Sequence, residues 1–124
     1  MEEKLRGIVV SNVNYGESDK ILGIFTLEKG IVSAKIKGVK KAGAKMKFAS
    51  EPFCFAEFVF SERAGKRTVI GASLIDSFYP IREDVERFFA GGTVLEYTKT
   101  FLYEGIKNQE YFLLLIETLK SLAY

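Results

Sequence analysis

The stretch Gly30-Ile31-Val32-Ser33-Ala34-Lys35-Ile36-Lys37-Gly38-Val39 decides the fold class, because apolar and polar side chains alternate along it. Side chains two residues apart in a β-strand point to the same face. Val32 and Ile36 therefore face a core, and Lys35 and Lys37 face the opposite side. This alternation predicts a strand over residues 30–39 with two lysines on its outer face.

The same kind of pattern recurs on both sides of this stretch. Strands are predicted over residues 4–15, 19–26, 52–62 and 67–78, and glycine-containing separators between them are typical of hairpin turns. Residues 42–50 lose the alternation and predict a loop with a short helix. Five strands with a short helix between the third and the fourth match an OB-fold, a partly open Greek-key barrel. An SH3-like barrel fits the same strand count.

The period of the apolar residues changes after Pro80. From Val85 to Leu102 they recur at spacings of three and four, which favours helix. Residues 81–84 predict a first helical turn, and Gly91-Gly92 predict a kink or a break. In the loop 104–108, Asn108 is placed to cap a last helix over residues 109–123. That helix is apolar on more than one face, so we expect further protein or a partner to cover it.

The sequence thus predicts a mainly β protein with C-terminal helices, namely a five-stranded OB-fold barrel followed by a partial α-helical domain. The barrel spans residues 1–79 and the helical part spans residues 80–124. A chain of 124 residues is long enough for a core of its own. Its hydrophobic content of 48% is typical of a packed protein.

The composition argues against several kinds of chemistry. Cys54 is the single cysteine and histidine is absent, so an internal disulfide, a Cys/His zinc site and an ordinary catalytic triad are excluded. Cys54 lies in an apolar strand, which predicts an inert thiol. We expect no catalytic residue, no metal and no cofactor, and therefore a protein that is not an enzyme. The polar start and the lack of a long apolar run predict a cytoplasmic protein without a membrane span.

Charge is distributed unevenly along the chain. Residues 1–79 hold 13 Lys+Arg against 9 Asp+Glu, net +4, whereas residues 80–124 hold 5 against 7, net −2. Seven lysines and no acidic residue lie between Lys29 and Ser50. A local field of one sign favours a polyanionic partner, and OB barrels bind oligonucleotides on the second and third strands and the loops beside them. A solvated strand edge, on which lysines discourage aggregation, is the alternative interpretation.

The first 79 residues are therefore predicted to form an OB-fold nucleic-acid-binding domain. Its predicted DNA-contacting residues are Arg6, Lys20, Lys35, Lys37, Lys40, Lys41, Lys45 and Lys47. Single-strand binders also stack bases on exposed rings beside a basic groove. Tyr15 and Phe48 are the candidates for base stacking, and Tyr79 is a third ring near a strand end. Phe53, Phe55, Phe58 and Phe60 sit in an apolar run and are predicted to pack in the core.

A series of short motifs, taken in order, covers almost the whole chain. They are Tyr15-Gly16-Glu17-Ser18-Asp19-Lys20-Ile21, Phe25-Thr26-x-Glu28-x-Gly30, Lys37-Gly38-Val39-Lys40-Lys41, Pro52-Phe53 and Ser77-Phe78-x-x-Ile81-Arg82-x-Asp84. The series resembles the RecO family of bacterial recombination mediators. The first motif is fairly specific, and the others carry weight because they occur in the same order.

This resemblance implies an N-terminal OB-fold followed by a helical domain. It also implies binding of single- and double-stranded DNA, annealing of complementary strands, and work with RecR to load RecA onto DNA coated with single-stranded DNA-binding protein. By motif, the basic surface of the family maps onto Lys35, Lys37, Lys40 and Lys41, and charge alone adds Lys45 and Lys47.

The sequence departs from the resembled family in its length. RecO chains are usually much longer, and many carry a four-cysteine zinc site in the part that has no counterpart here. The chain is therefore expected to be a fragment of a longer protein or a member that has lost the second half. Zinc binding and docking of the tail of the single-stranded DNA-binding protein, which the family places in the helical domain, are not carried over.

Two other functions fit the same residues. An RNA-binding OB barrel of the translation or ribosome-maturation kind would use the same lysines. A protein-interaction module would use the barrel as a scaffold and the apolar last helix as its contact surface, with a partner or with a second copy of the chain.

Overall fold

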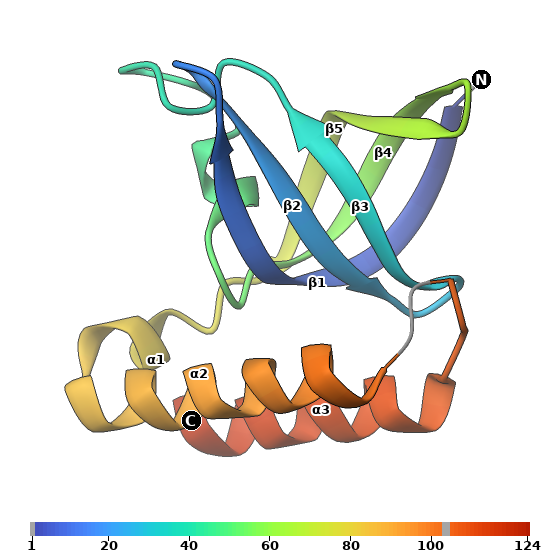
Figure 1. Cartoon of the computed structure of the whole chain (residues 1–124). Coiled ribbons are helices and arrows are strands. Elements are labelled where there is room, and N and C mark those ends of the chain that lie inside the picture. Colours follow the sequence, from blue (N-terminus) through green and yellow to red (C-terminus); the bar gives the residue numbers. More distant parts are fainter. Residues whose placement is uncertain (1, 103–104) are drawn as a thin grey trace.

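Five strands form a closed barrel, and helices follow it in the chain (Figure 1). The structure, a computed structural model, describes residues 2–102 and 105–124. The elements of the barrel are β1 (Glu2–Tyr15), β2 (Asp19–Thr26), β3 (Gly30–Ile36), the 3-10 helix η1 (Lys47–Ser50), β4 (Phe55–Arg63) and β5 (Lys66–Asp76). The strand order is β1-β2-β3-β5-β4, and β4 pairs back to β1. The predicted OB-fold, with a short helix between the third and fourth strands, is confirmed.

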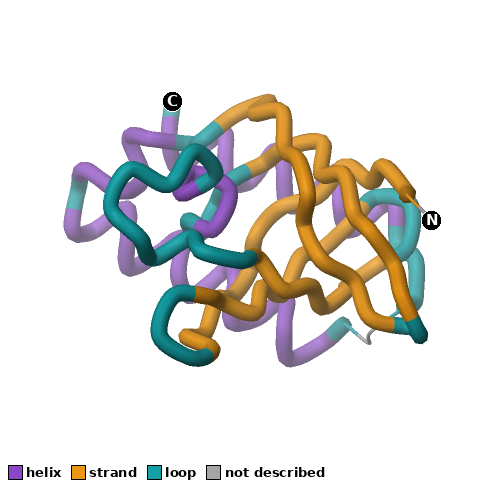
Figure 2. Tube along the Cα trace, turned by 90° about the horizontal axis from the view of Figure 1, so that it is seen from above, coloured by secondary structure: helices purple, strands orange, loops and turns teal. Residues whose placement is uncertain are grey.

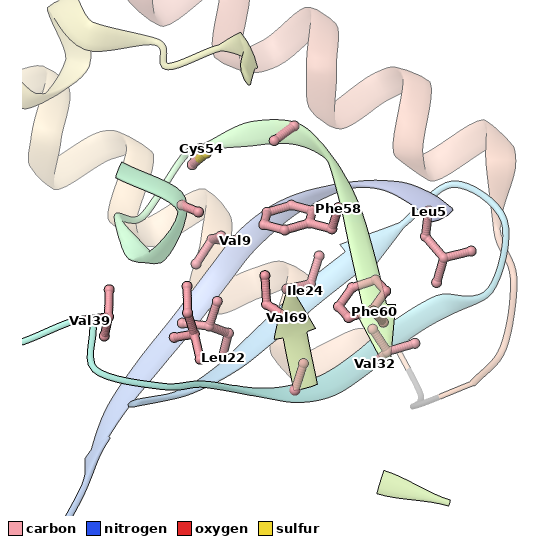
Figure 3. Packing of buried hydrophobic residues seen from close by; sticks show 14 residues of the cluster. Leu5, Val9, Leu22, Ile24, Val32, Val39, Cys54, Phe58, Phe60 and Val69 are labelled. Atoms are coloured by element: carbon pink, nitrogen blue, oxygen red, sulfur yellow. The ribbon is translucent and has the colours of Figure 1, made fainter. Parts of the chain in front are cut away.

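The interior of the barrel is filled by alternate residues of each strand (Figure 3). Leu22 and Ile24 of β2 point inward, as do Phe58 and Phe60 of β4, and all four are fully buried. On β3 the inward residues are Val32, Ala34 and Ile36, as the alternation predicted. The two phenylalanine rings of β4 stack with centroids 6.0 Å apart.

The helices are α1 (Tyr79–Glu83), α2 (Val85–Phe101) and α3 (Gln109–Ala123). They pack against one end of the barrel through a second apolar cluster (Figure 1). Phe25 of β2 meets Phe112 of α3 edge to face, with ring centroids 5.4 Å apart. The change from strand to helix falls near residue 79, as expected, and the division into domains 1–79 and 80–124 stays a prediction.

Six strand ends differ from the predicted bounds. β1 starts at Glu2 instead of Lys4, β4 ends at Arg63 and β5 starts at Lys66, and the three other ends differ for a backbone reason. β3 stops at Ile36 instead of Val39, because the chain turns at Gly38 with φ +67°. β4 starts at Phe55 instead of Pro52, and β5 ends at Asp76 instead of Phe78. Phe53 and Phe78 have positive φ values of 71° and 48°, and both rings are buried between barrel and helices. These two turns direct aromatic side chains into the second apolar cluster.

The two longer helices both begin with a side-chain cap, and of these only the cap of α3 was predicted. Asp84 ends α1 and caps α2, because its Oδ1 accepts hydrogen bonds from the N–H groups of Glu86 and Arg87 at 2.9 and 3.1 Å. The predicted first turn is thus a separate short helix. Asn108 caps α3 by accepting from the Tyr111 N–H at 3.0 Å, which confirms that prediction. Residue 104 of the predicted loop lies outside the described residues.

The break predicted as one alternative at Gly91-Gly92 is wrong, because α2 runs through both residues, and the other alternative, a kink, stays a prediction. Gly91 is buried, and a Cβ placed there would lie 2.8 and 2.9 Å from two ring carbons of Phe53. Apart from the backbone of its own helix, a Cβ at Gly92 would meet none of the described residues within 4 Å. Gly91 therefore permits close packing of α2 on Phe53, and this packing need is what the sequence pattern did not show.

The two adjacent glycines give a matched test of this packing. Gly92→Ala is expected to raise the free energy of unfolding by about 0.5–1 kcal/mol, because alanine favours helix. Gly91→Ala is expected to lower it by about 1 kcal/mol or more, because the added methyl overpacks the Phe53 ring. Urea unfolding of both variants measures the difference. Equal stabilisation by the two substitutions would contradict the packing role of Gly91.

Candidate nucleic-acid interface

The predicted lysines lie at the end of the barrel away from α2 and α3 (Figure 1). The β1–β2 turn, the segment after β3 and the β4–β5 hairpin are at this end. Figure 2 looks down on it, with the strands in front of the helices. Lys35 and Lys37 stand on the outer face of β3 and just beyond it. Lys40, Lys41 and Lys45 follow in the segment that leads to η1 and Lys47 is the first residue of η1, all of them exposed. We call these six lysines the cationic end.

The segment after β3 is tied to the β1–β2 turn. Asp19 Oδ1 accepts a hydrogen bond from the Gly38 N–H at 2.7 Å, and the Lys40 N–H donates to the Ser18 carbonyl at 3.0 Å. Val39 between them is buried in the barrel core. These contacts fix where Lys40 and its neighbours project.

The lysines of the cationic end carry free charge. Among the described residues, none of the six forms an ion pair with a carboxylate. Lys35 instead lies over the Tyr15 ring, with its Nζ 4.8 Å from the ring centroid, a cation–π arrangement. Lys29, outside the cationic end, is paired with Glu3 at 2.7 Å. The positive field at this end is therefore available to a ligand.

Two predicted residues are not brought to this surface. Arg6 lies near the opposite end of the β1–β2 pair, because Gly7 is in register with Thr26 whereas Tyr15 is in register with Asp19. Its Nε is 3.0 Å from Glu28 Oε2, so its charge is compensated.

Lys20 lies at the end of β2 that is near the cationic end, but its side chain is on the other face of the sheet. It pairs with the inward-facing Ile36 and shares the face of Leu22 and Ile24. We therefore leave Arg6 and Lys20 out of the interface. The prediction that these two residues contact DNA overlooked the length of β1, which separates Arg6 from the cationic end. It also overlooked that Lys20 shares a face of β2 with inward-pointing residues.

The candidate stacking rings are distributed over the molecule. Tyr15 is 52% exposed beside Lys35, and Phe48 is 37% exposed in η1. Tyr79 is equally exposed but lies on α1 with the Arg82 guanidinium over its ring. The prediction that Phe53, Phe58 and Phe60 are core residues is confirmed, and Phe55 is half-buried against the helices. Tyr15 is thus the ring best placed next to the free lysines.

A groove at the cationic end contains residues that the sequence interpretation missed. Its volume is about 660 Å³, and it lies between the outer face of the first three strands and the β4–β5 hairpin. Arg63 and Lys66 of the hairpin line it together with Lys35 and Lys37. Both hairpin side chains are exposed and, among the described residues, form no ion pair. The run Arg63-Ala64-Gly65-Lys66 was interpreted only as a turn, although its two cations were a usable signal.

Glu3 fixes the base of this hairpin. Its carboxylate pairs with Lys29 at 2.7 Å and with Arg67 at 2.5 Å. Hydrogen bonds from Lys29 and Arg67 hold the pKa of the Glu3 carboxyl below its usual range. The Arg67 guanidinium also lies 3.9 Å from the Glu62 carboxylate. Its positive charge is therefore compensated by carboxylates of the protein.

Cys54 is buried in the barrel core, and burial raises the pKa of its thiol to about 12. Within residues 2–102 and 105–124, no group of three or more His, Cys, Asp or Glu side chains could hold a metal ion. Across the same residues, no helix has the length and hydropathy needed to cross a membrane.

The fold and the surface define an OB-fold domain with packed C-terminal helices and a cationic end whose lysines form no ion pair within the described part of the chain. The family model described as "Recombination protein O N terminal" matches residues 1–78. The chain is 34% identical over 122 residues to the DNA repair protein RecO of Exiguobacterium sp. (strain AT1b), covering 98% of this chain and 49% of that protein. It is 33% identical over 119 residues to the DNA repair protein RecO of Caldicellulosiruptor saccharolyticus, covering 96% and 49%.

The chain therefore belongs to the RecO family, as its motifs indicated. It spans about half the length of the curated relatives that it matches.

Thiol labelling tests the burial of Cys54. With a pKa of about 12, only about one thiol in 10,000 is ionised at pH 8, so the native protein should react with Ellman's reagent at least a hundredfold more slowly than the unfolded chain. The rates are compared spectrophotometrically with and without guanidinium. Similar rates in the two states would show that the thiol is accessible.

Proposed function

We propose that this chain is a non-enzymatic DNA-binding part of a DNA repair and recombination protein. The single observation that carries the proposal is the gathering of six lysines without carboxylate partners, among the described residues, at one end of an OB barrel. A phosphate backbone is a polyanion whose bound counterions are released when lysines replace them. The names of the relatives, DNA repair protein RecO, support DNA as the natural polyanion.

The contacts at this surface favour binding without sequence preference. Sequence readout in DNA depends on hydrogen bonds to base edges in the grooves, often from bidentate arginine, asparagine or glutamine. The cationic end presents lysines, which bind phosphates as flexible point charges. Single- and double-stranded DNA both carry such phosphates, so both are proposed ligands.

Annealing follows from the same electrostatics. Two complementary strands repel each other until their phosphates are neutralised, and a lysine-rich surface supplies that neutralisation. By family membership we extend the proposal to work with RecR in loading RecA onto DNA coated with single-stranded DNA-binding protein.

The helices are the proposed surface for protein partners. Val85 and Phe89 of α2 are 87% and 77% exposed, and Leu113 and Leu114 of α3 are 60% and 61% exposed. Contiguous exposed apolar side chains are typical of protein contact sites, and Leu113 and Leu114 are neighbours in the sequence of α3. A protein-interaction role, including self-association through α3, is therefore the second candidate function. It predicts concentration-dependent association in sedimentation experiments and no dependence on nucleic acid.

RNA is tested by competition. The 124-residue chain is first bound to a fluorescent single-stranded DNA. Unlabelled DNA or RNA of equal length and sequence is then added, and release of the fluorescent strand is measured. A preference for DNA or equal displacement is compatible with the proposal. Displacement by RNA alone would favour the RNA-binding alternative.

Charge reversal tests the location of the site. Replacing Lys35, Lys37, Lys40 and Lys41 by Glu should weaken binding to a single-stranded oligonucleotide about a hundredfold or more, because four phosphate contacts become repulsive. Tm should hardly change, since the described carboxylates form no ion pair with these lysines. A variant with Glu at Arg87, Lys99, Lys107 and Lys120 carries the same net charge and should keep most of the affinity. Unchanged affinity in the first variant would place the site elsewhere.

Salt dependence tests the mechanism. If all six lysines contact the phosphates of one single strand, a plot of log Kobs against log[salt] should have a slope of about −4, at about 0.7 per contact, whereas a strand confined to four cations should give about −3. Fluorescence anisotropy titrations between low and physiological salt give this slope. A slope near zero would remove the proposed charge neutralisation.

A further inference from the structure

The cationic end, together with Arg63 and Lys66 of the β4–β5 hairpin, forms a positive surface with two parts. The first is the groove, in which Lys35, Lys37, Arg63 and Lys66 surround Tyr15 and Ile21. The second is the lysine loop, formed by Lys40, Lys41, Lys45 and Lys47, none of which lines the groove. We propose that the groove binds an unpaired DNA strand and that the lysine loop binds the phosphates of duplex DNA. This inference rests on the proposed function and divides its surface into two sites.

The groove offers contacts to bases as well as to phosphates. Tyr15 is 52% exposed, and Ile21 beside it is half-buried, so the lining includes an aromatic ring and an aliphatic side chain. A base can reach such side chains only when it is unpaired, because a duplex keeps its bases stacked inside. The volume of about 660 Å³ falls within the range of about 300–1,000 Å³ for concave ligand sites. The groove therefore suits a single strand.

Cations reach the groove from two separate elements. β3 pairs in parallel with β5, and Lys35 is in register with Thr68, so the start of β5, just after the hairpin turn, lies beside β3. The hairpin turns tightly at Ala64 and Gly65, whose φ values are 53° and 78°. Because Glu3 holds Arg67 at the base of the hairpin, the exposed Arg63 and Lys66 have a fixed support. A strand in the groove would meet positive charge from β3 and from the hairpin.

The lysine loop offers positive charge, with only small side chains between its lysines. Small residues, Ala42, Gly43 and Ala44, separate its two pairs of lysines, and two of these three residues are exposed. The nearest ring in the sequence is Phe48, which is 37% exposed in η1. An exposed segment of this kind contacts phosphates without reaching bases, and phosphates are what the outside of a duplex presents. The lysine loop therefore suits double-stranded DNA.

The two sites are held next to each other. The hydrogen bond from the Gly38 N–H to Asp19 Oδ1 joins the start of the lysine loop to the β1–β2 turn. Tyr15, at the other side of that turn, pairs with Asp19 and lines the groove. An unpaired strand and a duplex bound at these sites would lie side by side. This arrangement suits DNA in which a single-stranded segment adjoins a double-stranded one.

Matched double variants of the 124-residue chain test the division. The groove variant is Arg63→Glu with Lys66→Glu, the loop variant is Lys41→Glu with Lys45→Glu, and the control is Arg87→Glu with Lys120→Glu. All three change the net charge equally. Binding to an oligo-dT strand and to a blunt duplex with the same number of phosphates is measured by fluorescence anisotropy, and Tm is measured for each variant.

The groove variant should lose about tenfold or more in affinity for oligo-dT and less than about threefold for the duplex. The loop variant should show the reverse, and the control should change neither affinity by more than about twofold. Tyr15→Leu, which keeps the charge, should weaken binding of oligo-dT alone. If a charge reversal lowers Tm, the corresponding Gln variants replace it.

Equal losses for both ligands in the groove and loop variants would overturn the division while leaving DNA binding by the cationic end intact. Unchanged binding in both variants would also overturn it. If the unmodified chain binds neither ligand at low salt, the proposed function itself fails. These three results are distinguishable in one set of titrations.

Discussion

β1 pairs with β2 along one edge and with β4 along the other, and this double pairing closes the barrel. The pairing of β1 with β2 has a register shift between Val9 and Ser11, and a shift of this kind bends a strand. Different parts of β1 can therefore contact different parts of the protein. Val9 lies in the barrel core, Ile8 and Val10 pack with the helices, and Tyr15 reaches the groove at the far end. The core, the helical contact and the candidate interface therefore all depend on the course of one strand.

The pairing of charges separates structural cations from functional ones. Glu3 forms ion pairs with Lys29 and Arg67, and Glu28 forms one with Arg6. These cations therefore stabilise the connections between strands. The lysines of the cationic end have no such partners among the described residues. Since exposed ion pairs contribute little to stability, the protein loses little by leaving these lysines unpaired. A polyanionic ligand then meets charge that has not already been neutralised.

Much of this protein could be predicted from local sequence. The alternation in β3 correctly placed Lys35 outside and Val32 and Ile36 inside, because the pleat of a strand has a strict period of two. Lys37 is exposed as predicted but lies just beyond the end of the strand. Asn108 was recognisable as a helix cap for a similarly local reason. Arg6 and Lys20 were misplaced because their position depends on strand register, and Arg63 was missed because its neighbours come from another part of the chain.

By itself, the sequence determined the strand and helix periods, the concentration of lysine in one segment and membership of the RecO family. These properties are local or statistical, so they need no knowledge of distant contacts. Only the tertiary structure decided which cations are neutralised and which line a common groove with Tyr15. The physical reason is that ion pairs and concave surfaces arise where segments far apart in the chain meet, and barrel closure brings those segments together.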